Sequence, residues 1–170
     1  MMNQEKKPNI IIIFADDLGY GDLGCYGSKI NETPTLDKMA EEGKKFSNFY
    51  VSSPVCSPSR ASLLTGCYPQ RISFGTFDGL RVLFPGQGIG LSTEEKTIAK
   101  TLKESGYSTK IIGKWHCGDQ EDFLPTNHGF DSYFGIPYSN DMGRQVKIKD
   151  YIPNDSSLHK ITKWDRPPLP

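Results

Sequence analysis

The feature that most constrains the fold of this chain is the apolar run in "PNIIIIFADD" at residues 8–17. Five large apolar residues, Ile10 to Phe14, follow one another without any polar alternation. A strand buried on both faces of a parallel sheet has this pattern, whereas a strand with one face in solvent alternates. The run therefore predicts a buried parallel strand that ends on two adjacent carboxylates, Asp16 and Asp17.

The segments after this run alternate between helical and extended patterns. Thr33 and Pro34 open an amphipathic stretch as N-cap and first-turn residues, and Ser92 with Glu95 forms a capping box before another. The pattern predicts a helix within 33–46 that stops at Gly43, further helices over 59–65 and 92–106, and strands over 46–51 and 107–113. We therefore expect an α/β fold with a mostly parallel sheet sandwiched by helices.

The remaining segments are irregular. Residues 68–92 are rich in glycine, proline and aromatic residues, which predicts a long surface loop that is either functional or disordered. From about residue 120 no clear period is visible, and residues 144–170 read as an irregular, proline-rich, extended end. With 170 residues the chain has the length of one domain, so we treat 1–170 as a single unit of fold.

Composition limits the partners and the compartment. Twenty basic and twenty acidic residues give a net charge of zero, which argues against nucleic acid or a membrane surface as the main partner. No run approaches the ~18 apolar residues of a membrane span. The apolar run near the N-terminus is too short for a signal peptide, so the chain is expected to be cytoplasmic unless a leader was removed, in which case it is periplasmic or secreted. The four cysteines form no C-x-x-C pair, which makes a zinc site or disulfide framework a weak interpretation.

Asp16 and Asp17 have two interpretations. Adjacent carboxylates repel each other, and a hard divalent cation with oxygen ligands would relieve that repulsion. Taken alone, "DDLG" fits a turn with two solvated aspartates better than a metal site.

The stretch "SSPVCSPSRASLLTG" at 52–66 places Cys56 where a helix begins and Arg60 one helical turn later. Backbone N–H groups at a helix start and a guanidinium could together hold an oxyanion. The alternative is an incidental thiol and a surface arginine. The C-x3-R spacing with Pro58 inside does not match the C-x5-R cradle of thiol phosphatases.

Lys114 and His116 flank Trp115 directly after the strand predicted at 107–113. Residues i and i+2 of an extended chain point to the same side, so a cation and an imidazole could face one pocket. A strand-end lysine beside a packed histidine is the plainer alternative. Because ligands bind beyond the carboxyl ends of parallel strands, we expect these residues, Cys56 and the two aspartates at one edge of the sheet.

Together these motifs resemble the formylglycine-dependent (type I) sulfatases of the alkaline phosphatase superfamily. "CSPSRASLLTG" is similar to their first signature, C/S-x-P-x-R followed by L-T-G, and "GYSTKIIGKWHCG" to their second. "IIIIFADDLGYGDLGCYG" resembles their first metal-binding segment, and "FLPTNHGFDSYFGIPYSNDM" the arylsulfatase A-like members. The resemblance covers residues 8 to 143 and identifies the chain as the N-terminal portion of such an enzyme.

The resemblance implies hydrolysis of sulfate monoesters. Cys56 would be oxidised by a formylglycine-generating enzyme to formylglycine (3-oxoalanine), whose hydrate offers one hydroxyl to attack sulfur and a second to expel sulfate. Asp16 and Asp17 would bind Ca2+, with Mg2+ as the alternative, together with residue 56. Lys114 would hold the sulfate, and the remaining implied roles are stabilisation by Arg60, proton removal by His116 and a substrate contact by Ser139, with Asp141 near it.

The chain departs from this family in length. Family members have several hundred residues and carry further metal ligands, a histidine, a lysine and the general acid downstream, none of which is in these 170 residues. Three functions therefore stay open: sulfatase, phosphate or phosphonate ester hydrolase of the same superfamily, and an inactive fragment or binding module. The resemblance points to a sulfated small molecule or sulfated sugar as substrate.

Overall fold

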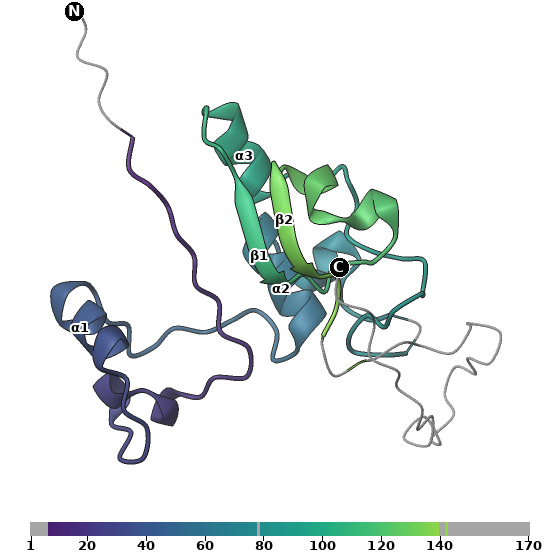
Figure 1. Cartoon of the computed structure of the whole chain (residues 1–170). Helices are drawn as coiled ribbons and strands as arrows, with labels where there is room; N and C mark the ends of the chain where they lie inside the picture. The colour runs from purple at the N-terminus through teal and green to yellow at the C-terminus, as the bar shows by residue number, and fades with distance from the viewer. Residues whose placement is uncertain (1–6, 78, 140–141, 143–170) are drawn as a thin grey trace, which may run out of the picture. The chain divides into compact units, whose positions relative to one another are not determined.

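The structure is a computed structural model that describes residues 7–77, 79–139 and 142. The chain divides into two compact units, Met1–Phe49 and Tyr50–Pro170, and each is treated by itself below. Figure 1 labels the helices and strands. The prediction for 144–170 and the position of Asp141 lie outside the described residues.

The first unit consists of two 3-10 turns, η1 (Tyr20–Asp22) and η2 (Gly24–Tyr26), and the helix α1 (Pro34–Glu42). The Asp37 carboxylate connects these elements because Oδ1 accepts from the Cys25 N–H at 2.6 Å and from the Thr33 hydroxyl at 3.0 Å. The predicted helix is confirmed, although the Thr33 side chain bonds to Gly24 N–H rather than capping α1. No described residue of this unit is fully buried, so hydrogen bonds rather than a core organise it.

The two strands predicted at 8–17 and 46–51 are wrong. Residues 8–17 and 46–51 form no strand, and Ile11 and Ile13 are 82% and 75% exposed. A parallel strand is stable when neighbouring strands satisfy its backbone and other elements cover its faces. Neither segment finds a ladder partner among the described residues, so the apolar pattern alone does not produce a strand.

The second unit holds the sheet. Strands β1 (Lys110–Lys114) and β2 (Ser132–Ile136) lie side by side and parallel, with Ile112 opposite Phe134 (Figure 1). β1 confirms the strand predicted at 107–113. The sequence did not predict β2, because no clear period is visible after about residue 120. Gly113 faces Gly135 across the pair, and a side chain on Gly135 would collide with the Gly113 carbonyl.

One face of this sheet covers the core. Ile111 and Tyr133 pack against a buried apolar cluster, while Ile112 and Phe134 on the other face are 68% and 69% exposed. The buried strand predicted at 107–113 is therefore buried on one side only. The cluster consists of Ala61, Ile72, Phe74, Phe77, Leu83, Leu91, Trp115 and Cys117.

Five of the eight residues of that cluster come from the segment predicted to be a surface loop. Between 68 and 92 the structure has one short helical turn, η3 (Pro69–Ile72), yet Phe74, Phe77 and Leu83 are at most 3% exposed and Leu91 is fully buried. The prediction of an irregular segment is confirmed and the prediction of a surface position is wrong. Glycine and proline prevent regular structure here, but the aromatic and leucine side chains still gain from leaving water.

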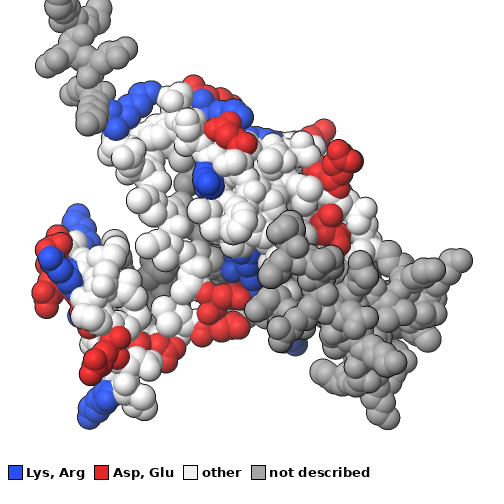
Figure 2. Space-filling model, viewed as in Figure 1, with Lys and Arg blue, Asp and Glu red and all other residues white. Residues whose placement is uncertain are grey.

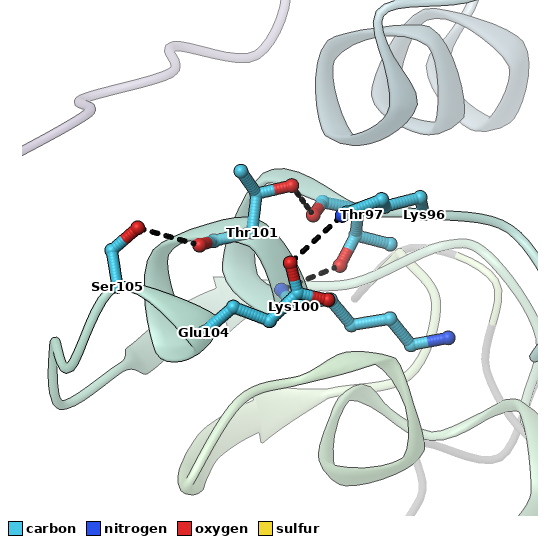
Figure 3. A network of polar contacts seen from close by, with 6 residues as sticks. All are labelled: Lys96, Thr97, Lys100, Thr101, Glu104 and Ser105. Carbon is cyan, nitrogen blue, oxygen red and sulfur yellow. Dashed lines mark hydrogen bonds and ion pairs between the residues drawn. The ribbon is translucent and has the colours of Figure 1, made fainter.

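The ends of the two α-helices of this unit are set by capping residues. α2 (Cys56–Thr65) starts three residues earlier than predicted and ends at Gly66, whose φ of 69° suits a left-handed C-cap. α3 (Ile98–Glu104) starts later than predicted because the Thr97 hydroxyl, and not Ser92, accepts from the Lys100 N–H. Figure 3 shows this cap and the Lys96–Glu104 ion pair at 2.8 Å that spans α3. The turns η4 (Glu121–Phe123) and η5 (Pro125–His128) connect β1 to β2.

The charged residues of the described chain are interspersed. Figure 2 shows basic and acidic side chains together on the face in view, as expected for a chain whose net charge is zero. Among the described residues, no helix is long and apolar enough to cross a membrane.

Candidate active site

The centre of the candidate site is the start of helix α2. Cys56 is the first residue of this helix, and Val55 before it is extended, so the Cys56 side chain lies at the positive end of the helix dipole. Cys56 is partly exposed, whereas Ser57 and Pro58 behind it are buried. This arrangement leaves the thiol accessible while the turn that carries it is held in the core.

Lys114 lies against Cys56. Its ammonium group is 3.2 Å from Cys56 Sγ, although 58 residues separate the two in the sequence. Lys114 is the last residue of β1, so the carboxyl end of this strand meets the start of α2. The structure therefore confirms that the two signature segments meet at the end of a strand, as the sequence predicted.

Arg60, on helix α2, contacts the end of strand β1. Its Nη1 donates to the backbone carbonyl of Lys114 at 2.7 Å. The hydrogen bond ties the first turn of α2 to the end of β1, which keeps the Lys114 backbone beside Cys56. In this geometry Arg60 fixes the position of the lysine, a role that the sequence pattern did not predict.

Cys117 lies buried behind the same region. It is fully inaccessible, and burial raises the pKa of its thiol far above the usual range, although the positive charge of Arg60 opposes part of this rise. A neutral, buried thiol is unreactive. Cys25, Cys67 and Cys117 are free thiols among the described residues.

His116 does not follow the strand geometry that the sequence suggested. β1 ends at Lys114, and His116 has a φ of 59°, a left-handed conformation that is rare for a residue with a side chain. The alternation of side chains along a strand therefore does not put the His116 side chain on the same face of the sheet as the Lys114 side chain. Instead the His116 N–H donates to Pro137 O at 2.8 Å, and its ring Nε2 lies 2.8 Å from Leu83 O.

Leu83 also contacts the residue after the candidate nucleophile. Its N–H donates to the Ser57 hydroxyl at 3.0 Å, so the backbone of one buried residue connects the segments of Cys56 and His116. Sequence reasoning missed both Ser57 and Leu83. Ser57 occupies a variable position of C-x-P-x-R, and Leu83 lies in the irregular 68–92 segment, so no sequence signal marks either residue.

Asp16 and Asp17 belong to the first unit and are exposed. Asp17 has a φ of 55°, which aspartate tolerates better than most residues. The described residues contain no cluster of three or more His, Cys, Asp or Glu side chains able to hold a metal ion. Two adjacent carboxylates fit the oxygen preference of Ca2+, which takes six to eight oxygen ligands, so they would supply only part of a site.

Ser139 is buried three residues beyond the end of β2, and its carbonyl accepts from the Met142 N–H at 3.2 Å. It thus lies in the segment that also supplies the Pro137 carbonyl to His116. A contact between its hydroxyl and a substrate stays a prediction.

The described geometry thus brings a lysine at the end of a strand to a cysteine at the start of a helix. The family model described as Sulfatase matches residues 8–167. The chain belongs to the sulfatase family.

Individual relatives agree with this assignment. The chain is 51% identical to human arylsulfatase A over 140 residues, which cover 81% of this chain and 27% of that protein. It resembles the crystal structure of Ps i-CgsB in complex with k-i-k-neocarrahexaose, with a TM-score of 0.73, 42% identity, and coverage of 87% of this chain and 31% of that one. It also resembles BT4656 in complex with its substrate D-glucosamine-2-N,6-O-disulfate, with a TM-score of 0.62, 33% identity, and coverage of 75% and 23%. The chain thus spans about a quarter of the length of arylsulfatase A.

Proposed function

We propose that residues 1–170 form the N-terminal part of a sulfatase catalytic domain and that the protein hydrolyses sulfate monoesters at residue 56. The observation that carries this proposal is the contact between Lys114 Nζ and Cys56 Sγ at the start of α2. In the thiol form, Sγ stands in for the oxygen of formylglycine. A cation 3.2 Å from that atom suits an oxygen nucleophile and a transferring sulfate better than it suits a structural cysteine.

When Cys56 has been oxidised to formylglycine, the residue supplies a geminal diol, which a serine or cysteine cannot. The residues around it then have separable tasks. Lys114 neutralises negative charge on the sulfate and on the residue-56 oxygen. Arg60 keeps Lys114 in place through its backbone carbonyl. His116 accepts a proton from the second hydroxyl.

Asp16 and Asp17, with the oxygen of residue 56, would hold Ca2+, with Mg2+ as the alternative. Such a cation would polarise the sulfate group and lower the pKa of a nearby hydroxyl. The remaining oxygen ligands and the acid that protonates the leaving alcohol must come from other residues, since the described residues form no larger cluster.

We propose a sulfated sugar as the substrate class, with Ser139 as a substrate contact. The support is that one solved relative binds a neocarrahexaose and another acts on a glucosamine disulfate. The matched region covers less than a third of each relative's chain.

The test is modification of Cys56 by a formylglycine-generating enzyme. Co-expression should convert Cys56 to formylglycine, a loss of about 18 Da from the tryptic peptide that contains it, whereas ordinary thiol oxidation adds mass. Cys25, Cys67 and Cys117 should keep their mass and serve as internal controls. An unmodified Cys56 in a longer, folded form of the protein would contradict the proposal. Matched sulfate and phosphate esters would then separate sulfatase from phosphatase activity.

A further inference from the structure

We infer that Ser57, acting through the backbone of Leu83, fixes His116 in the tautomer that is protonated on Nε2, so that Nδ1 is the basic nitrogen of the ring. This inference rests on the proposed function only for its catalytic meaning. The geometry on which it depends is independent of whether Cys56 is modified.

The first step concerns the ring of His116. Its Nε2 lies 2.8 Å from the carbonyl oxygen of Leu83. A carbonyl oxygen has no proton to donate, so the hydrogen of this bond must be on Nε2. A neutral imidazole carries one N–H, and the other nitrogen, Nδ1, is then the basic one.

The second step concerns the support of Leu83. Its N–H donates to the hydroxyl oxygen of Ser57 at 3.0 Å, which anchors the peptide chain that ends in the acceptor carbonyl. Leu83 is 3% exposed, and Ser57 and His116 are 0% exposed. Water cannot replace either bond at these positions, and a buried polar group left without a partner is unfavourable.

The third step concerns the backbone of His116. A φ of 59° together with the N–H bond to Pro137 O holds the main chain of His116 in one conformation. The ring nitrogen Nε2 is in turn held by the Leu83 carbonyl, which sets the tautomer. We assign Ser57 as a positioning residue, because it acts on His116 through Leu83 and needs no contact with substrate.

The experiment is long-range 1H–15N NMR of the histidine rings in the 170-residue chain at about pH 8, where a neutral imidazole is expected from the usual histidine range. The chain has three histidines, and the loss of signals in His116→Gln assigns the ring of interest. We expect the cross-peak pattern of a neutral ring protonated on Nε2. A His116 ring that is protonated on Nδ1 would overturn the inference.

Ser57→Ala tests the support, and Ser62→Ala is its matched control. Ser62 is a buried serine of the same helix, but its hydroxyl donates to Pro58 O and does not contact Leu83. Ser57→Ala should speed solvent exchange of the His116 Nε2 proton roughly five- to tenfold, the effect of losing one supporting hydrogen bond. Ser62→Ala should leave it unchanged.

Ser57→Cys covers the case in which Ser57→Ala does not fold. A thiol is similar in size but a weak acceptor, so exchange should again accelerate while packing is kept. Equal exchange rates in the parent chain and in the folded Ser57 variant would overturn the assignment of Ser57. Because the measurement uses unmodified Cys56, its outcome does not depend on sulfatase activity.

Discussion

The buried imidazole of His128 should make the stability of the second unit depend on pH. His128 is 0% exposed, its ring lies 5.5 Å from that of Trp115, and neither ring nitrogen has a hydrogen-bond partner among the described residues. Burial first, and the positive charge of Lys100 second, lower the pKa of His128 from 6.5 to about 4. The folded chain therefore keeps this residue neutral under conditions in which the unfolded chain protonates it.

The size of the effect follows from linkage. The contribution to the free energy of unfolding is complete above pH 6.5 and is lost as the pH falls from 6.5 to about 4, because only the unfolded chain gains the proton in that range. A shift from 6.5 to about 4 corresponds to a loss of about 3 kcal/mol at the acid end and about 2 kcal/mol near pH 5. For a chain of this size, about 2 kcal/mol lowers Tm by about 4–8 °C.

The substitution His128→Leu tests this reasoning, since leucine has a similar volume and does not titrate. The assay is urea unfolding at about pH 7.5 and about pH 5, followed by the fluorescence of Trp115, which is 1% exposed in the folded chain. His128→Leu should lose about 2 kcal/mol less stability than the parent chain between these two conditions. An equal loss in both proteins would refute the argument that His128 is the group that senses pH.

Three further outcomes follow from the same structure. Arg60→Met should lower the free energy of unfolding by about 1.5–3 kcal/mol, because it removes a charge-assisted hydrogen bond to the Lys114 carbonyl. The control Arg71→Met, at an exposed position, should change the free energy of unfolding little in parallel thermal melts. Asp131, whose pKa is lowered to about 2 by a hydrogen bond from Lys103 and then by the Thr109 N–H, stabilises the fold above pH 3.8, and this contribution is lost as the pH falls through about 2. Acid titrations of Asp131→Asn should therefore be flatter below pH 3.8 than those of the parent chain. Asp17→Asn in a longer, active form should reduce calcium-dependent turnover. Its thermal unfolding temperature without calcium should stay the same or rise, because the repulsion between the two carboxylates is relieved. A lower unfolding temperature with normal turnover would make Asp17 a structural residue.

Local sequence was sufficient for the presence of the helices and for the site motifs, although not for the first residues of α2 and α3. Pro34 at a first turn, Gly66 after α2 and the C-x-P-x-R spacing act over a few residues, so their consequences can be read without knowing the rest of the fold. The predicted meeting of Cys56 and Lys114 also held, because the carboxyl ends of strands and the starts of helices gather at one edge in α/β folds.

Sequence patterns failed where a segment depends on its neighbours. The run at 10–14 has the composition of a buried strand, yet it is exposed, because a strand needs a partner to satisfy its backbone. β2 has an exposed Phe134 beside glycine, a pattern that indicates a strand only once Ile112 is known to lie opposite.

The amino-acid sequence by itself determined the family, the cysteine at residue 56 and the types of residue in the motifs around it, because these are matters of chemistry at fixed spacing. Tertiary structure alone decided how the residues cooperate. Arg60 reaches the Lys114 carbonyl, and Leu83 joins Ser57 to His116, across separations of 26 to 54 residues. Hydrogen bonds of this kind depend on the path of the backbone through the core, and no local pattern encodes which carbonyl will lie within reach of which side chain.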